Sequence, residues 1–389
     1  MQVRYREALS SSRQEQVRDS FAAYLRPLAP YLDAALISPE ALADIADVAR
    51  VLPERLALFT FGFECRLGAP APQADFLLCA TAGSGGRDVL AQPDSYPEWP
   101  AAVRQDPTWQ RVFTFAQHWA EEGSSLQSHV DNVWLEFDVE RSPGPVPVPS
   151  LFFSPEAAVR RTRRAEDTPT RVTASGLALL LGESPGNLRA RLAPIFEALP
   201  GGARVFQVGA MLSRRTDAVR LCIDRLAPAA LIELVEHLVG TASARAIRDA
   251  VQAWSGLADE ICLNLDMGTE LSARIGLECY FLGESHPAKL QRLRAFLDHL
   301  VEKGLCTPAK RAGVLAYPGV SDEQRDRALW PELLLRSSSF MGPGTLSVFV
   351  RDVHHLKLVC HPEGRLEAKA YLSAGHRWHR GAALGPTGR

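Results

Sequence analysis

The order of the predicted secondary-structure elements constrains this 389-residue chain more than any single motif does. Segments with helical periodicity precede a pair of strand-like runs, and this helix–helix–strand–strand order recurs five times without visible sequence identity between the units. Polar turns join the two runs of each pair, which indicates antiparallel neighbours, because parallel strands need a crossover connection. The strand-like pairs are at residues 57–67 and 75–81, 132–140 and 150–153, 204–212 and 218–225, 260–267 and 273–282, and within 355–375.

Ten antiparallel strands with helices between the pairs exclude a doubly wound parallel sheet. The simplest closed arrangement is an α+β fold, in which a ten-stranded antiparallel β-barrel is built from five ααββ repeats with the helices outside. An open antiparallel sheet with one helical layer is the alternative. We expect residues 1–375 to form a single domain and residues 376–389 to be a disordered tail.

The composition, 46% hydrophobic and 23% charged, is that of a globular protein. A net charge of -2 predicts no general attraction to nucleic acid or to an anionic membrane, so any anion site must be local. No apolar run approaches membrane-spanning length, and the N-terminus has no apolar signal core. The seven cysteines form no CxxC motif, which predicts buried, reduced thiols and a cytoplasmic location. The richness in Arg, Ala, Leu and Pro suggests a bacterial source.

Alternation within the strands separates an apolar face from a polar face that is rich in charge. If helices surround a barrel, the apolar face packs against them and the polar face lines the lumen. A solvated outer face is the alternative, although aromatic side chains in the polar phase favour a binding chamber. The residues predicted to point inward are Glu64, Arg66, Trp134, Glu136, Asp138, Arg220, Cys222, Asp224, Cys262, Asn264, Asp266, Arg274, Gly276, Glu278, Tyr280, His355, Lys357, Lys369 and Tyr371.

Two short segments carry a family resemblance. FGFECRL (61–67) resembles the first-strand segment of the dimethylallyltryptophan synthase-like aromatic prenyltransferases, and KAY (369–371) resembles the Lys-x-Tyr pairs of that family. These enzymes are ABBA prenyltransferases, whose PT barrel consists of five helix–helix–strand–strand units. Arg220 in VRLC and Arg274 in ARIGLEC stand on second strands of hairpins, where the family has basic residues. As architecture, the resemblance covers the whole chain.

The resemblance implies a transferase that moves a prenyl group from an isoprenoid diphosphate to an indole, phenol or peptide aromatic acceptor in secondary metabolism. Its implied catalytic residues are Glu64 and Lys369. Glu64 would hold the acceptor, and Lys369 would take the ring proton; His355 is the alternative for the second role. No cofactor is expected; Mg²⁺ held by carboxylates is the alternative, without metal-binding spacing to support it. We expect a monomer or homodimer. The implied substrate-binding residues are Arg66, Arg220, Arg274, Lys357, Tyr371, Trp134, Tyr280, Glu136 and Glu278.

The sequence also departs from the family. Its richest strand reads Arg-x-Lys-x-Tyr, whereas here Arg274 is followed by Gly276 and Glu278. The inward carboxylates would repel a diphosphate unless the cations gather at one end of the lumen. The alternative function is therefore a PT-barrel protein that has lost diphosphate chemistry and binds or matures a peptide or small molecule in natural-product biosynthesis. Clustered cations would favour the first function, and carboxylates interleaved among them would favour the second. A third option is an open-sheet accessory protein without a chamber.

The segment VRDVHH places Asp352, His354 and His355 close together. Adjacent residues of a regular strand point to opposite faces, so the two histidines are able to act jointly only if the strand contains a β-bulge.

Overall fold

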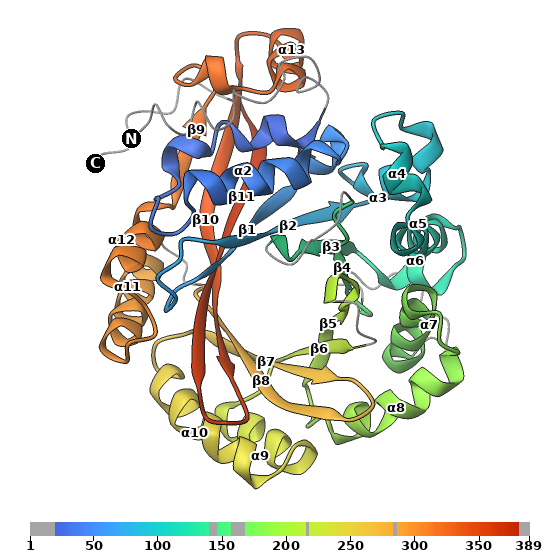
Figure 1. Cartoon of the computed structure of the whole chain (residues 1–389), viewed down its shortest axis with the longest axis vertical. Coiled ribbons are helices and arrows are strands. Elements are labelled where there is room, and N and C mark those ends of the chain that lie inside the picture. The colour runs from blue at the N-terminus through green and yellow to red at the C-terminus, as the bar shows by residue number, and fades with distance from the viewer. Residues whose placement is uncertain (1–19, 140–145, 157–167, 215–217, 283–285, 381–389) are drawn as a thin grey trace.

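The computed structural model describes residues 20–139, 146–156, 168–214, 218–282 and 286–380. Ten of its strands close into an antiparallel barrel, and the helices lie around the outside (Figure 1). The order around the ring is β11–β1–β2–β3–β4–β5–β6–β7–β8–β10, and pairing of β10 with β11 closes it. The barrel strands are β1 (Thr60–Arg66), β2 (Ala74–Thr81), β3 (Asn132–Phe137), β4 (Ser150–Phe153), β5 (Arg204–Ala210), β6 (Val219–Asp224), β7 (Glu260–Met267), β8 (Leu271–Tyr280), β10 (Thr345–Cys360) and β11 (Leu366–Arg380). The predicted ten-stranded barrel is confirmed, and the open sheet is excluded.

The helices depart from a strict two-helix repeat. Two α-helices precede β5 and two precede β7, as predicted, whereas the other units carry additional short helices. The helical segments are η2 (Phe21–Leu25), η3 (Ala29–Tyr31), α2 (Pro39–Arg50), η4 (Glu54–Leu58), α3 (Gly86–Ala91), η5 (Pro93–Ser95), α4 (Ala101–Gln105), α5 (Pro107–Ala120), α6 (Ser125–His129), α7 (Pro169–Leu181), α8 (Pro185–Ala198), η7 (Leu212–Arg214), α9 (Pro228–Leu238), α10 (Thr241–Trp254), α11 (His286–Glu302), α12 (Pro308–Ala316), η8 (Arg327–Leu329) and α13 (Glu332–Met341).

A recurrent dipeptide starts five of the outer helices. A Ser, Thr or Asp side chain accepts a hydrogen bond from a backbone N–H of the first turn, and proline occupies the next position. The side chain satisfies a donor that the helix leaves free, and proline lacks the N–H that would otherwise be unpaired there. The local sequence therefore fixes where α2, α5, α7, α8 and α12 begin.

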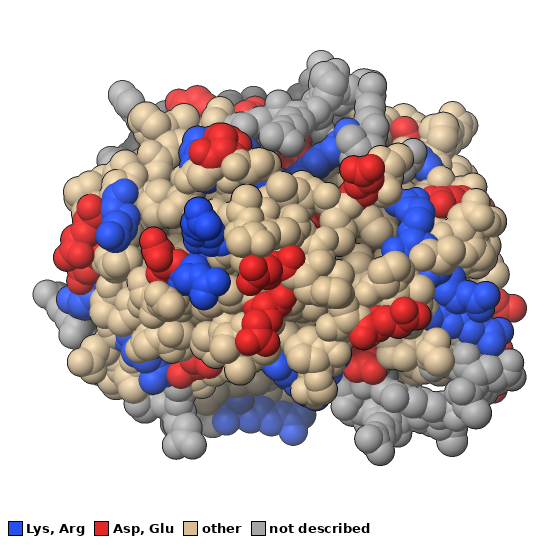
Figure 2. All heavy atoms as spheres, turned by 90° about the horizontal axis from the view of Figure 1, so that it is seen from below, with Lys and Arg blue, Asp and Glu red and all other residues tan. Residues whose placement is uncertain are grey.

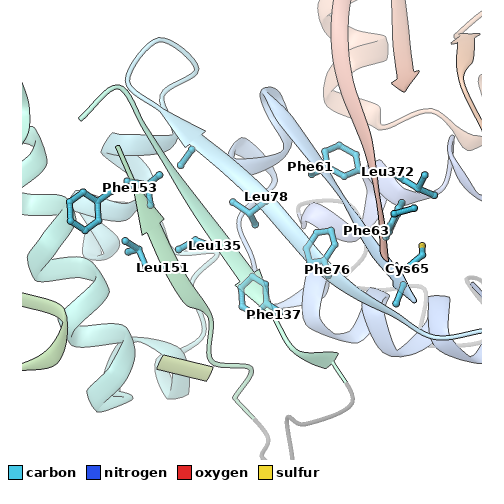
Figure 3. Close-up of a cluster of buried hydrophobic side chains, with 14 of the residues drawn as sticks. Phe61, Phe63, Cys65, Phe76, Leu78, Leu135, Phe137, Leu151, Phe153 and Leu372 are labelled. Carbon is cyan, nitrogen blue, oxygen red and sulfur yellow. The ribbon is translucent and has the colours of Figure 1, made fainter. Parts of the chain in front are cut away.

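The hydrophobic core lies between the barrel and its helices. The outward phase of β1, β2 and β3 supplies fully buried aromatic and aliphatic side chains (Figure 3). Phe61 packs edge-on against Phe21 of η2 with ring centroids 5.0 Å apart, and Phe76 stacks on Phe137 at 6.1 Å. All seven cysteines are buried and free, as predicted. The inward polar phase is therefore left to the lumen.

The β10–β11 hairpin is longer than the other pairs. Its strands have 16 and 15 residues, so the hairpin continues past the barrel, where a short strand, β9 (Gly319–Asp322), pairs with β10. Residues 376–380 were predicted to be part of a disordered tail, but they belong to β11 and pair with 345–349 of β10. The backbone pairing with β10 orders this segment despite its polar sequence. Residues 381–389 lie outside the described residues.

Candidate functional site

The barrel lumen contains two cavities of very different size. A wide chamber of about 480 Å³ lies at one end, and a narrow cavity of about 10 Å³ lies next to it. Tyr371 lines both. The wide chamber is lined by Leu77, Asp131, Asn132, Trp134, Glu136, Ser154, Glu156, Arg204, Phe206, Gln207, Asp224, Glu260, Cys262, Glu278, Tyr280, Leu282, His354, His355, Tyr371, Leu372 and Ser373. The narrow cavity is lined by Glu64, Arg214, Arg220, Asn264, Asp266, Arg274, Gly276, Lys357, Val359, Lys369 and Tyr371.

The register of the strands sorts charge along the barrel axis. On β8, Arg274 and Gly276 line the narrow cavity, whereas Glu278 and Tyr280 line the wide chamber. The neighbouring strands are offset so that cations collect at the narrow cavity and carboxylates with aromatic rings collect at the wide one. Most of the residues predicted to point inward therefore line one of the two cavities, whereas Arg66, Asp138 and Cys222 line neither.

The first ion pair of the narrow cavity connects β1 and β11, the first and last strands of the barrel in sequence. Lys369 Nζ of β11 lies 2.5 Å from Glu64 Oε1 of β1, and the Tyr371 hydroxyl donates to the other carboxylate oxygen. Burial alone would raise the pKa of the Glu64 carboxyl, but the Lys369 ammonium and both hydrogen bonds hold it well below its usual range. Glu64 is therefore an ionised carboxylate whose oxygens both have partners.

Two further clusters occupy the rest of the narrow cavity. Lys357 donates to Glu278 Oε1 at 3.0 Å and also to the side-chain oxygen of Asn264. Gly276 makes this crossing possible, because a Cβ there would lie 3.0 Å from the Asn264 Cβ and 3.2 Å from the Lys357 Cε. Burial would raise the pKa of the Glu278 carboxyl, yet Lys357 and His355 lower it to about 2. The space beside Gly276 is thus filled by the stem of Lys357.

Asp266 holds the arginines of β6 and β8. Arg220 donates to both of its oxygens, at 2.6 and 2.9 Å, and Arg274 Nη1 lies 3.4 Å from Oδ2. Burial opposes the charge of Asp266, but Arg220 lowers the pKa of this carboxyl to about 2. Bidentate arginine–carboxylate geometry is among the strongest polar contacts in proteins, so this cluster is firmly held.

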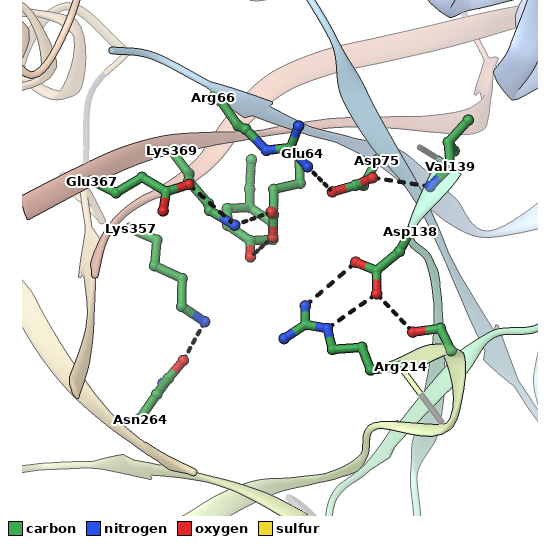
Figure 4. Close-up of polar contacts among 12 residues, drawn as sticks. Glu64, Arg66, Asp75, Asp138, Val139, Arg214, Asn264, Lys357, Glu367 and Lys369 are labelled. Carbon is green, nitrogen blue, oxygen red and sulfur yellow. Dashed lines mark hydrogen bonds and ion pairs between the residues drawn. The ribbon is translucent and has the colours of Figure 1, made fainter. Parts of the chain in front are cut away.

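Arg214 is a fifth cation that the sequence analysis missed. It lies in η7, outside any strand, and its guanidinium donates to Asp138 at 3.0 Å (Figure 4). No periodicity signal marks a residue in such a turn. Arg66, by contrast, does not line the narrow cavity; it pairs with Asp75 at 3.3 Å. Burial, together with the neighbouring Glu64, raises the pKa of the Asp75 carboxyl to about 7.

Four of the five predicted cations therefore gather at one end, and carboxylates are interleaved among them. The lining of the narrow cavity contains five cations and two carboxylates, Glu64 and Asp266. Two carboxylates outside this lining also pair with these cations: Glu278 with Lys357 and Asp138 with Arg214. A volume of about 10 Å³ is room for about one water molecule. In this arrangement the cations form ion pairs with carboxylates of the protein itself.

Glu136 stands apart from these pairs. It lies on the chamber wall two residues from Trp134, and within the described residues no hydrogen bond or ion pair engages its carboxyl. Burial in the lumen, followed by the field of Glu64, raises its pKa to about 7. Glu136 is thus able to gain or lose a proton near neutrality.

Both histidines of VRDVHH face the chamber. A β-bulge between Val353 and His355 shifts the register of β10, which places the Nδ1 atoms of His354 and His355 2.8 Å apart. The condition set by the sequence analysis is therefore met. The His355 ring stacks on Tyr371 at 4.1 Å, and its Nε2 atom is buried without a hydrogen-bond partner in the described part of the chain. Burial lowers the pKa of His355 to about 3, so this imidazole is neutral.

The remaining expectations concern ligands and partners. Within the described residues, no three His, Cys, Asp or Glu side chains are grouped to hold a metal ion, and no helix combines the length and apolarity needed to cross a membrane. Figure 2 shows a face on which acidic and basic side chains are interspersed. The predictions of metal independence, of no nucleic-acid partner, of a cytoplasmic location and of the oligomeric state stay predictions.

The closed barrel of ten antiparallel strands inside a shell of helices is the PT-barrel architecture. Among solved structures, the chain is similar to AnaPT from Neosartorya fischeri, with 13% sequence identity and a TM-score of 0.49. That alignment covers 95% of this chain and 97% of the other. No protein-family model and no curated protein matches the sequence.

Proposed function

We propose that this chain is a PT-barrel protein without isoprenoid-diphosphate chemistry, whose wide chamber binds an aromatic small molecule or peptide side chain. The observation that carries the proposal is the pairing of every cation at the narrow cavity with a carboxylate of the barrel itself. The cavity between them has room for about one water. The free volume, by contrast, lies in the chamber that Trp134, Phe206 and Tyr280 line.

Charge supports the same conclusion. A diphosphate at the narrow cavity would have to displace Glu64 from Lys369 and Asp266 from Arg220, and both carboxylates would stay nearby. Like charges ~4 Å apart repel by about 4 kcal/mol at an effective dielectric of about 20. The repulsion between the diphosphate and the displaced carboxylates would therefore offset much of its attraction to the cations.

The chamber also has one group suited to proton transfer. Glu136 has a pKa raised to about 7, and a general acid or base works best when its pKa is near the working pH. His355, whose pKa is lowered to about 3, is too weak a base for this role. We infer that any chemistry on the bound molecule is proton transfer at Glu136.

Aromatic prenyl transfer is the second candidate, favoured by one specific observation. The five cations at the narrow cavity exceed the two carboxylates in its lining, and the cavity adjoins the aromatic chamber at Tyr371. In that case the cations would neutralise the leaving diphosphate, Glu64 would hold the acceptor and Trp134 would stabilise the allylic cation. This function requires the ion pairs to open.

Calorimetric titration separates the two candidates. We expect no heat and no thermal stabilisation from dimethylallyl or geranyl diphosphate, with or without Mg²⁺. Saturable binding that Lys369→Ala weakens by about 1.5–3 kcal/mol, the scale of a charged hydrogen bond, would establish the diphosphate site and overturn the proposal.

A second titration tests the chamber itself. An uncharged aromatic probe, 1-naphthylmethanol, is expected to bind at millimolar concentrations and to bind more weakly to Trp134→Ala. Trp378→Ala is the matched control, because Trp378 lies on the part of β11 outside the barrel and is partly exposed. Equal loss of binding in both variants would remove Trp134 from the site.

A further inference from the structure

The charge of the wide chamber restricts what it is able to bind. Its described lining contains six carboxylates, and Arg204 is the one Lys or Arg among these residues. Arg204 is already committed, because its guanidinium donates to both oxygens of Asp224 at 2.8–3.0 Å. The lining carboxylates are Asp131, Glu136, Glu156, Asp224, Glu260 and Glu278.

Partners within the protein account for several of these carboxylates. Glu278 accepts from Lys357 at 3.0 Å and from the Tyr280 hydroxyl at 2.9 Å. Glu260 accepts from the backbone N–H of Arg225 at 3.2 Å. Glu136 differs: it is half-buried on the chamber wall, and none of the described residues donates to it. A partly buried carboxylate without a donor is a position for a counter-charge or a proton.

The rings that line the same chamber as Glu136 favour a cation as the counter-charge. Trp134 is on the same face of β3, and its ring is edge-on to the His354 ring with centroids 6.2 Å apart. The Tyr280 ring lies 5.7 Å from His354 and 5.0 Å from His355. Aromatic faces attract positive charge, and they also provide flat apolar surface for a ring.

A second, independent observation points to a ligand. His355 is 6% exposed and lines the chamber, and its Nε2 atom is buried without a hydrogen-bond partner among the described residues; the nearest carboxylate oxygen given for it, Glu278 Oε1, is 4.0 Å away. Its other nitrogen is engaged by His354 at 2.8 Å. Because an unpaired buried polar atom is costly, Nε2 is a position that a polar group of a ligand would satisfy.

We propose that the chamber's ligand is a positively charged aromatic molecule, which places an ammonium or guanidinium group at Glu136 and its ring beside Trp134 and Tyr280. The inference rests on the proposed function, and it adds the charge class of the ligand. Glu136 repels an anion, and the lining cation Arg204 is already paired with Asp224, so a carboxylate or phosphate ester with the same ring is disfavoured.

Three naphthalene probes that differ chiefly in charge test this inference by calorimetry. We expect 1-naphthylmethylamine to bind about tenfold more tightly than 1-naphthylmethanol, and 1-naphthylacetate to bind more weakly than both. In Glu136→Gln, which preserves the shape of the side chain, the advantage of the amine over the alcohol should disappear while the alcohol binds as before. Glu233→Gln, on the exposed face of α9, is the control and should retain the advantage.

The outcomes distinguish a wrong charge class from a wrong proposed function. If the alcohol binds and the amine binds no more tightly, or if the amine keeps its advantage in Glu136→Gln, the charge class is wrong and the aromatic chamber stands. If none of the three probes binds at millimolar concentrations, the proposed function fails and the inference fails with it.

Discussion

Two carboxylates a short distance apart in the lumen have opposite protonation behaviour. Glu64 is held ionised because Lys369 and Tyr371 donate to it, whereas Glu136 has burial without a donor in the described residues. Desolvation acts on both, and the local partners decide the sign of the pKa shift. Glu64 is therefore engaged by its lysine and tyrosine, whereas Glu136 has no donor among the described residues.

The raised pKa of Glu136 predicts how stability changes with pH. A carboxyl with a pKa of about 7 in the folded state and about 4.5 in the unfolded state stabilises the fold fully below pH 4.5, and this contribution is lost as the pH rises to about 7. Glu136→Gln removes this titration. The free energy of unfolding of the variant minus that of the wild type should therefore increase by at most about 3 kcal/mol as the pH rises from 4.5 to 8.

Urea unfolding at several pH values measures this difference. The contributions of groups that titrate in both proteins cancel when the two free energies of unfolding are subtracted. The charged groups that act on Glu136 are Glu64 of β1, Lys357 of β10, Arg220 of β6 and Arg214 of η7. A difference between variant and wild type that is independent of pH would contradict the raised pKa.

The Lys369–Glu64 pair predicts a non-additive pair of mutations. Lys369→Met leaves the Glu64 carboxylate buried without its counter-ion, which should reduce the free energy of unfolding by about 3–5 kcal/mol. Adding Glu64→Gln removes the stranded charge, so the double variant should be more stable than the single Lys369→Met variant. A double variant whose loss equals the sum of the two single losses would indicate that the pair is not coupled.

At the level of elements, the seam between β1 and β11 depends on a glycine. Glu64 is opposite Tyr371 across this seam, and a Cβ at Gly62 would overlap the backbone carbonyl oxygen of Leu372. Backbone atoms of a paired strand have little room to shift. Gly62→Ala should therefore reduce the free energy of unfolding by about 1–3 kcal/mol or more, measured by urea unfolding.

Gly83→Ala is the matched control for the seam. A Cβ at Gly83 meets open space, so this variant should be neutral within about 0.5 kcal/mol. Equal stability of the two variants would show that β1 and β11 do not approach as closely as the structure indicates.

The contacts that start the helices are local in sequence, whereas those that form the histidine bulge are not. Ser38-Pro39, Asp106-Pro107 and Thr168-Pro169 start helices through contacts within one turn, so the sequence alone indicates these boundaries. The bulge of β10 depends on how 353 and 355 pair with β11, which is a contact between distant segments. From the sequence alone it follows only that His354 and His355 need a bulge to act jointly.

For the whole molecule, closure of the barrel predicts uniform protection of its strands. β1 pairs with β11 on one side and β2 on the other, just as β6 pairs with β5 and β7. In hydrogen-exchange measurements the amides of β1 and β6 should therefore be protected to a similar degree. Rapid exchange confined to β1 and β11 would indicate an open seam and would contradict the closed barrel.

The sequence by itself determined the ten strands, their antiparallel pairing and the identity of the inward phase, including Trp134, Glu136 and Lys357. These properties follow from the alternation of polar and apolar residues, which repeats every two positions within a strand and needs no knowledge of other strands.

Only the tertiary structure decided where each inward residue lies along the barrel axis. The offsets between neighbouring strands placed Lys369 against Glu64 and separated the cationic cavity from the acidic chamber, and they left Glu136 without a partner among the described residues. Axial position depends on hydrogen-bond register between segments that are far apart in the chain, and alternation carries no information about it. For that reason the sequence alone does not distinguish the two proposed functions.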